Sequence, residues 1–516
     1  MKSRITNFLN NNTEKIIIFT AILLSLLSLL YYYNNGLITS YGDSRAHLNI
    51  ARRTVDSLTP GLAQLGGVWL PLLHVLMLPT IWNDFMWHSG LSGSIVNMPM
   101  YVIAVYYIYK LIFLVTKNKF SGLIGSIILG SNINLLYIQS TPMTEVLFVS
   151  TLVAGVYYLT LWAKTRNILH LITSAVFFFL TSFNRYEGWP VLFGAIAVVA
   201  IVSFFNKDKK KTEGRLIIFG SIAFLSIFLW LLWQTAIFHN PIYFLNSEFS
   251  AKSQTLIAIN QGMIPQYKNL SVAIITFYYS LVHINGLIVL ITTLTGILML
   301  IIGAILKKNK LSPYLNLPLI ILFIPGLFLI FALYNGNIPL SVPEVFANNK
   351  PGTYFNIRYA LYSLPALAVF SSILLKNKIY KALILIVVLL NAYLLFGQGL
   401  NKIATIKDSQ YNFLKEVSPT SRWIKENYKK GYILASAATA DPIIFGTGLD
   451  IKRFITEGNG KYWEESMQNP SKYANFIILT YGDERDMVNK HVDHKELNSN
   501  FRLSQSFGVF RIYVKK

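Results

Sequence analysis

The chain has 516 residues, of which 53% are hydrophobic and only 13% are charged. Soluble domains carry about a quarter charged residues, so this composition excludes a water-soluble enzyme built only from globular domains. The 45 Lys and Arg residues exceed the 23 Asp and Glu residues by 22, and this basic excess could serve nucleic acid, an anionic membrane or membrane topology. The absence of cysteine excludes a disulfide scaffold, a thiolate metal site and a cysteine nucleophile.

About eleven apolar segments approach the length of about 20 residues that a helix needs to cross a bilayer. The first, 16–33, is too long for a signal peptide and lacks a small-residue cleavage site, so we interpret it as a retained helix. The other expected spans are 92–116, 120–140, 143–163, 168–184, 188–205, 216–238, 283–306, 313–333, 358–375 and 380–397. The sequence therefore predicts an α-helical polytopic membrane protein.

Basic residues gather at every second junction between these segments. They are Lys117 and Lys119; Lys164 and Arg166; Lys207, Lys209, Lys210, Lys211 and Arg215; Lys307, Lys308 and Lys310; and Lys376, Lys378 and Lys381. Short loops rich in Lys and Arg stay cytoplasmic, which predicts a multi-pass protein of the cell membrane with a cytoplasmic N-terminus. Lysines divided among loops in this way do not form a nucleic-acid-binding surface, so no nucleic-acid partner is expected.

This topology predicts that three loops, 35–91, 239–282 and 334–357, and the tail lie on the outer side. Within the first loop, the apolar run 68–82 is only about 15 residues long and contains Pro71 and Pro79, so we expect a re-entrant or interfacial helix. The stretch 271–282, before the eighth span, could likewise form a re-entrant or interfacial helix.

The tail has a different composition from the membrane segments. Short β-like runs at 432–435, 476–480 and 508–514 lie beyond a helical stretch that contains Trp423 and Ile424. We therefore expect two parts: a membrane module at 1–398, with the first outer loop 35–91 as its catalytic loop, and an extracytoplasmic α/β domain at 399–516.

The first outer loop begins with an amphipathic pattern. Leu48, Ala51, Val55 and Leu58 recur at helical spacing, which predicts a helix over 44–58 that lies on the outer membrane surface. Asp43 stands at its N-terminal edge, where a helix cap and a functional carboxylate are equally good interpretations.

Further ionisable residues mark the outer ends of other spans. Glu145, Arg185, Glu187 and Arg358 come from different turns, and ionisable groups at membrane depth are costly and usually functional. Each also has a structural alternative: Arg185 and Glu187 could form a mutual pair, Arg358 could reach the interface, and Glu145 could cap a helix. Their shared level on one face favours a common site.

These motifs resemble the GT-C superfamily of integral-membrane glycosyltransferases, close to the protein O-mannosyltransferase and lipid A aminoarabinose transferase branch, glycosyltransferase family 39. The resemblance covers most of the membrane region. It is carried by Gly42-Asp43, Ile50-Ala51-Arg52, Trp69-Leu70-Pro71-Leu72, Thr144-Glu145, and Arg358-Tyr359 with Pro365.

The resemblance implies the GT-C fold, a polyprenyl-phosphate sugar donor, transfer on the outer face and inversion at the anomeric carbon. Asp43 matches the catalytic aspartate, Glu145 a second acidic position near the acceptor, and Arg185 and Arg358 two basic positions, the latter near the phosphate. Relatives often have a second acid after the first, whereas this chain has Ser44. No cofactor or metal ligand is assigned, and a divalent cation remains an alternative.

The chemistry of transfer requires a base for the acceptor hydroxyl and cations for the departing phosphate. Asp43 is the candidate base. The candidate phosphate-binding residues are Arg45, Arg52, Arg53, Arg185 and Arg358. The candidate cleft residues are His47, Trp69, His74, Glu187, Tyr243 and Glu248. Structural histidines and an interfacial aromatic belt are alternative interpretations for His47, His74 and Tyr243.

The sequence thus predicts a membrane glycosyltransferase that transfers a sugar to a protein, lipid or glycan hydroxyl. The alternative is a polytopic lipid or solute transporter or flippase. Transporters need ionisable groups near the bilayer midplane and often contain inverted repeats, neither of which is evident in this sequence. An inactive structural partner of a glycosylation complex stays open.

Overall fold

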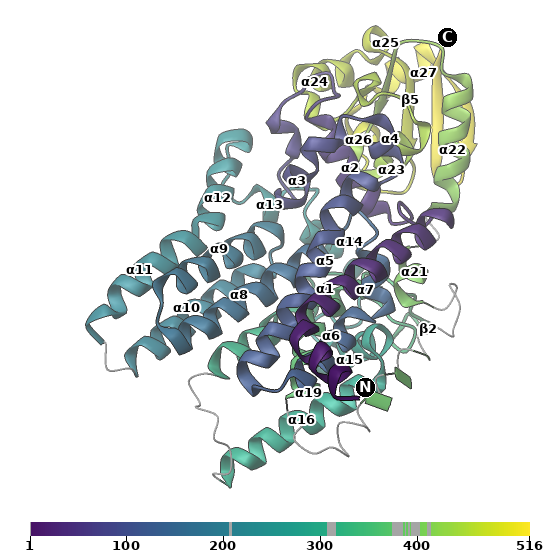
Figure 1. Ribbon diagram of the computed structural model, residues 1–516. Coiled ribbons are helices and arrows are strands. Elements are labelled where there is room, and N and C mark those ends of the chain that lie inside the picture. The colour runs from purple at the N-terminus through teal and green to yellow at the C-terminus, as the bar shows by residue number, and fades with distance from the viewer. Residues whose placement is uncertain are drawn as a thin grey trace.

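The computed structural model describes residues 2–205, 209–306, 316–373, 403–409 and 414–516, together with 385–386, 389–390 and 393. Figure 1 shows a large helical part below a domain that contains a β-sheet and the C-terminus. This arrangement confirms the expected class, an α-helical polytopic membrane protein with a small α/β domain at its C-terminal end.

Four helices in the described residues are long and apolar enough to span a membrane unaided. They are Asn12–Asn34 of α1 (Lys2–Asn34), α5 (Leu91–Thr116), α8 (Glu145–Thr165), and Leu317–Tyr334, which joins η3 (Leu317–Phe323) to α18 (Ile324–Tyr334). Two bent pairs also qualify: α11 (Thr212–Ala223) with α12 (Leu225–Phe238) at 41°, and α15 (Leu270–Asn285) with α16 (Leu287–Ile305) at 111°. The stretch 271–282 is therefore a helix that meets the next one at a sharp bend.

Shorter apolar helices account for most of the other expected spans. The segments 168–184 and 188–205 form α9 (Ile168–Asn184) and α10 (Gly188–Phe204), and 358–375 forms η4 (Ile357–Ser363) followed by α19 (Leu364–Ser372). The expected span at 380–397 lies outside the described residues except for five positions.

The prediction of one continuous span at 120–140 is wrong. The segment forms two helices, α6 (Lys119–Gly130) and α7 (Ile133–Ile138). The Asn132 side chain breaks the helix, because its Oδ1 accepts a hydrogen bond from the Leu135 backbone N at 3.0 Å and so starts α7.

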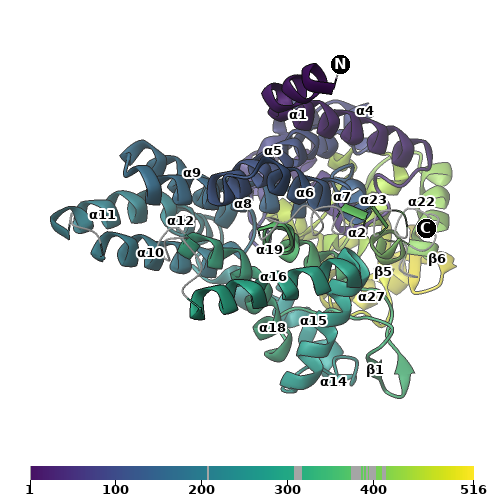
Figure 2. The same ribbon diagram turned by 60° about the horizontal axis from the view of Figure 1, so that its bottom comes forward.

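The helical part is organised around α8, which is largely buried by its neighbours. It packs against α5 and α9, and α19 packs against α6 and α16. In Figure 2 helices α9–α12 extend to one side, while α14 (Ala251–Asn260), α15, α16 and α18 lie below the centre. The remaining short elements here are η2 (Lys209–Lys211), α13 (Tyr243–Asn246), β1 (Phe346–Ala347) and β2 (Lys350–Pro351).

The C-terminal domain contains a five-stranded mixed sheet in the order β4-β3-β5-β7-β6. Strands β3 (Tyr432–Ala435), β4 (Phe454–Ile455) and β5 (Ala474–Thr480) are parallel, whereas β7 (Phe510–Lys515) runs antiparallel to β5 and β6 (Phe501–Phe507). These strands confirm the three β-like runs of the tail. The helical elements of this domain are α22 (Leu414–Asn427), α23 (Ala437–Thr447), η6 (Ile451–Arg453), η7 (Glu457–Asn459), α24 (Lys461–Gln468), α25 (Pro470–Tyr473), α26 (Met487–His491) and α27 (His494–Asn500). The preceding helix α21 (Ala404–Ser409) packs against α7 and η4 of the helical part.

The first loop forms α2 (Gly42–Arg53), η1 (Leu62–Leu65), α3 (Leu72–Ile81) and α4 (Asp84–His88). The expectation that the first of these helices lies on the membrane surface is wrong. Helix α2 ends at Arg53 and is buried on most sides, because α3 and α23 cover it. Its apolar face therefore contacts protein, which a helical pattern alone cannot distinguish from contact with lipid.

The loop and the C-terminal domain share one hydrophobic core that includes Leu48, Leu73 and Ile444. A buried ion pair between Arg53 and Asp441 joins them. The Asp56 carboxylate also accepts a hydrogen bond from the Ile451 backbone N at 3.1 Å. The expected boundary near 398 lies outside the described residues, and it remains a prediction.

Candidate functional site

Arg358, in η4, is the centre of an ion-pair cluster drawn from four distant parts of the chain. Its Nε donates to Glu145 Oε1 at 3.0 Å, and its Nη1 lies 3.5 Å from Asp408 Oδ2. Its Nη2 pairs with the Asp43 carboxylate. The guanidinium lies over the ring of Tyr41 at 4.8 Å from its centroid. These contacts bring α2, α8, η4 and α21 together at one point.

Arg185, at the C-terminal end of α9, forms the second half of the cluster. Its Nε and Nη2 donate to the two carboxylate oxygens of Glu187 at 3.1 and 3.0 Å. Its Nη1 donates to Thr144 Oγ1 at 2.7 Å and lies 3.8 Å from Glu145 Oε1. Glu145 thus lies between both arginines, and the two halves form one network.

The cluster holds four carboxylates, from Asp43, Glu145, Glu187 and Asp408, against two guanidinium groups. An excess of buried negative charge is unfavourable unless a proton or another cation neutralises part of it. Burial raises the pKa of Asp408 to about 6, although Arg358 acts in the opposite direction, so protonation of this acid is favoured in the cluster. Glu145 Oε2 is buried and has no hydrogen-bond partner among the described residues.

Accessibility separates Asp43 from the other acids. The Asp43 side chain is 42% exposed, whereas those of Glu145, Glu187 and Asp408 are 0%, 3% and 1% exposed. A substrate can therefore reach Asp43, while the three buried acids hold the arginines in place. The cluster joins five predicted site residues, Asp43, Glu145, Arg185, Glu187 and Arg358, as well as Asp408.

A neutral histidine pair lies beside the cluster. His47 Nδ1 is 2.8 Å from His74 Nε2, and the His47 ring lies 4.5 Å from the ring of Trp69. Burial, together with the positive charges of Arg185 and Arg358, lowers the pKa of His47 to about 3. Since His47 follows Asp43 by four residues on α2, both side chains lie on one face of the helix.

Three other predicted arginines are not in the cluster. Arg52 Nε and Nη2 lie 3.1 and 2.6 Å from carboxylate oxygens of Asp56 and Asp84, and its Nη1 donates to the Ile81 carbonyl at 3.1 Å. Arg53 pairs with Asp441 of the C-terminal domain. Arg45 points into a separate cavity. Arg52 and Arg53 thus have protein partners that keep the first loop folded.

Tyr243 and Glu248 line another cavity of about 380 Å³, next to Met487 of the C-terminal domain. The Phe244 ring, between them in sequence, stacks on Tyr186 at 5.0 Å. The Tyr186 hydroxyl donates to the Val68 carbonyl at 2.7 Å, so this outer segment supports the loop that carries Trp69.

No known protein family and no curated protein sequence matches the chain. Solved structures do match. The ArnT protein of Cupriavidus metallidurans, in a crystal structure with undecaprenyl phosphate, aligns over 95% of this chain and 97% of its own, with 8% identity and a TM-score of 0.52. The oligosaccharyltransferase of Archaeoglobus fulgidus, tethered to an acceptor peptide, aligns over 92% of this chain and 70% of its own, with 12% identity and a TM-score of 0.51. Both of these proteins have the GT-C fold. The chain therefore has the GT-C fold.

In this GT-C fold, Asp43 lies on α2, which packs against α23 of the C-terminal domain, and it pairs with Arg358 of η4, which packs against α8 and α15 of the helical part. Among the described residues, no group of three or more His, Asp or Glu side chains is arranged to hold a metal ion. The cluster acids instead surround guanidinium groups, and we assign no metal ligand.

Sequence reasoning missed Asp408 and Tyr41, which belong to this cluster. The Tyr41 hydroxyl donates to Asp408 Oδ2 at 3.1 Å, and the Asn356 backbone N donates to Asp408 Oδ1 at 2.9 Å. One available signal was the place of Asp408, an acid just after the last apolar segment on the expected outer side.

Proposed function

We propose that the chain is a membrane glycosyltransferase that moves a sugar from a polyprenyl-phosphate donor to an acceptor hydroxyl on the outer face. The observation that carries this proposal is the partly exposed Asp43 carboxylate, held by Arg358 within the GT-C fold. The undecaprenyl phosphate in the ArnT structure supports a lipid-phosphate donor. The alternation of basic loops supports the outer face as the side of transfer.

The proposed reaction is a single displacement. The acceptor oxygen forms a bond to the anomeric carbon, while the bond from that carbon to the donor phosphate oxygen breaks. The phosphate leaves with the bonding electrons, and Asp43 takes the proton of the acceptor hydroxyl. Attack from the face opposite the leaving group inverts the anomeric centre.

Arg358 and Arg185 would hold the donor phosphate. A guanidinium has five N–H donors and pairs well with phosphate oxygens. Arg358 pairs with three carboxylates, and that of Asp43 is the most exposed of them. An incoming phosphate would therefore displace Asp43 rather than the buried Glu145 or Asp408. Donor binding would then release the carboxylate that acts as the base.

The other cluster residues would position these groups. Glu145 touches both arginines, and a change there would move both. The Tyr359 ring lies 4.8 Å from the Arg185 guanidinium and 5.0 Å from that of Arg358, which fixes their spacing. His47, Trp69 and His74 would form the wall of the cleft beside Asp43.

The test starts from the lipids that co-purify with the full-length protein. Mass spectrometry of the detergent-purified chain is expected to find a polyprenyl phosphate or its glycosylated form, and Arg358→Ala is expected to lose it. The Lys429→Ala variant is a suitable control, because Lys429 is exposed and lies outside the cluster. Retention of the same lipid by Arg358→Ala would contradict the phosphate site.

The second step supplies that lipid with a labelled sugar and follows the label. Transfer to a hydroxyl with inverted anomeric configuration supports the proposal. Movement of intact lipid or sugar across sealed proteoliposomes without transfer would contradict it and favour a transporter.

A further inference from the structure

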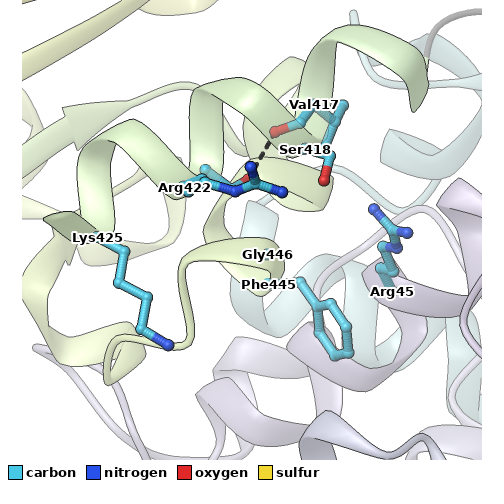
Figure 3. A pocket seen from close by; sticks show the side chains of 8 residues that line it. Arg45, Val417, Ser418, Arg422, Lys425, Phe445 and Gly446 are labelled. Atoms are coloured by element: carbon cyan, nitrogen blue, oxygen red, sulfur yellow. Dashed lines mark hydrogen bonds between the residues drawn. The ribbon is translucent and has the colours of Figure 1, made fainter.

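A cavity of about 340 Å³ lies between α2 and the C-terminal domain. Arg45 reaches it from α2, Ser418, Ser421, Arg422 and Lys425 from α22, and Phe445 and Gly446 from α23 (Figure 3). Pockets of this size hold small molecules or the headgroup of a larger one.

Three of the lining side chains are cationic and none is acidic. None of the three cations has an ion-pair partner in the described part of the chain. Two acids near this region already have cationic partners: Asp84 pairs with Arg52 at 2.6 Å, and Asp450 with Lys452 at 3.4 Å. The lining of the cavity thus carries a net positive charge, and no ion pair to a described acid is present at these three side chains.

Arg45 is fixed in an orientation that leaves donors free. Its Nε donates to the Thr39 carbonyl at 2.8 Å, and its guanidinium lies 5.9 Å from the centre of the Phe445 ring. Its two terminal nitrogens have no described hydrogen bond. Burial lowers the pKa of Arg45, so an anion beside it would stabilise its charged form. Ser418, across the cavity, adds a hydroxyl that can donate.

The cavity is separate from the Arg358 cluster but lies close to it in sequence. Arg45 is two residues from Asp43 on α2, and side chains two apart on a helix point about 200° apart. Asp43 points to Arg358, whereas Arg45 points to α22 and α23. A molecule held here would contact the C-terminal domain on one side and the helix of the proposed base on the other.

We infer that this cavity binds an anionic group of the sugar acceptor, a phosphate or a carboxylate, as a second anion site beside the donor phosphate site. The acceptor role rests on the proposed function. Because the cavity is formed by α2 and the C-terminal domain and not by the membrane helices, an acceptor can reach it without competing with the lipid donor. The anion fixes one end of the acceptor against α22 and α23, and the acceptor extends past α2 to bring its hydroxyl to Asp43 on the other side of that helix.

The binding test uses the full chain in nanodiscs of neutral phosphatidylcholine, with inorganic phosphate and glucuronate as separate probes in calorimetry. The double variant Arg422→Ala/Lys425→Ala is expected to bind the preferred probe at least about tenfold more weakly, as expected for the loss of charged hydrogen bonds. Lys429→Ala, an exposed lysine just beyond α22, is the matched control and is expected to bind as the wild type does.

Equal binding by the double variant and the wild type, or no binding of either probe to the wild type, would overturn the site. Loss of binding in Arg358→Lys with retention in the double variant would also overturn it, because the anion would then lie in the cluster. These results do not depend on sugar transfer, so a failure of the proposed function is distinguishable from a failure of this site.

Two further arms test what the anion belongs to. In nanodiscs with phosphatidylglycerol, phosphate affinity is expected to stay the same; a large loss would assign the cavity to a membrane lipid and overturn the acceptor role. In the transfer assay the double variant is expected to raise the acceptor KM about tenfold with little change in kcat. An unchanged KM would contradict acceptor binding.

Discussion

The ion pair between Arg53 and Asp441 offers a quantitative test of how the first loop and the C-terminal domain are joined. Both side chains are only 11% exposed, and the Asn49 side-chain amide also donates to the Asp441 backbone oxygen at 3.0 Å. Removing one member of a buried pair typically costs 3–5 kcal/mol, because the other charge stays buried without a partner. We therefore expect Asp441→Leu to lower the free energy of unfolding by about 3 kcal/mol.

For a cooperative unit of about 150–250 residues, this loss corresponds to a fall of about 6–12 °C in Tm. The assay is thermal unfolding of the purified chain in one detergent at one heating rate. The double variant Arg53→Met/Asp441→Leu is expected to recover most of the loss, because no charge remains buried. Asp450→Asn is the control, since Asp450 pairs with Lys452 at the surface and such pairs contribute about 0–1 kcal/mol. A double variant that is as unstable as Asp441→Leu would refute the reasoning.

Two further predictions concern stability. Burial raises the pKa of Asp408 to about 6 in the folded protein, so its favourable contribution is complete below about pH 4 and is lost as the pH rises through about 6. The free energy of unfolding of Asp408→Asn is expected to rise relative to that of the wild type between pH 5 and 7.5, by at most about 3 kcal/mol, which appears as a growing difference in Tm; a difference that is constant with pH would contradict the shift. A Cβ at Gly296 would lie 2.0 Å from the Phe370 carbonyl oxygen in α19, so Gly296→Ala is expected to cost about 1–3 kcal/mol in thermal unfolding. Gly214→Ala in α11 has no atom within 4 Å and is expected to be neutral or stabilising, and equal losses for the two variants would refute the packing argument.

Apolar length and turn chemistry sufficed to predict much of the fold. Runs such as 92–116 carry too many apolar side chains to be stable in water, and this length predicts a membrane helix. In the tail, short apolar runs alternate with polar turns, which predicts strands. The break at Asn132 was not predicted because the apolar residues on both sides dominated the interpretation, although Ser131, Asn132 and Asn134 interrupt the apolar run and Asn132 is a typical helix-capping residue. The burial of α2 was also missed, because one of the two helices that cover it, α23, comes from almost 400 residues later in the chain.

The candidate site could be predicted only at residues whose type is unusual for their place in the sequence. Asp43, Glu145, Arg185 and Arg358 stand out because ionisable groups are rare at the ends of apolar segments. Arg52 and Arg53 look equally suitable in the sequence, yet each has a protein carboxylate as its partner. The pair between Arg53 and Asp441 depends on a tertiary contact that no local pattern encodes, whereas Asp56 follows Arg52 by four residues and was a local signal of pairing.

The most direct test of the central claim is the rate of sugar transfer by Asp43→Asn at saturating donor. Asparagine keeps the size of the side chain but cannot accept the acceptor proton, and loss of a general base typically slows a reaction by about 10²–10⁴-fold. Asp450→Asn, a carboxylate of similar exposure outside the site, is expected to transfer at the wild-type rate. The account predicts that Asp43→Asn still binds the polyprenyl-phosphate donor but has lost at least about 99% of transfer. Wild-type turnover by Asp43→Asn would remove Asp43 from the mechanism and contradict the account.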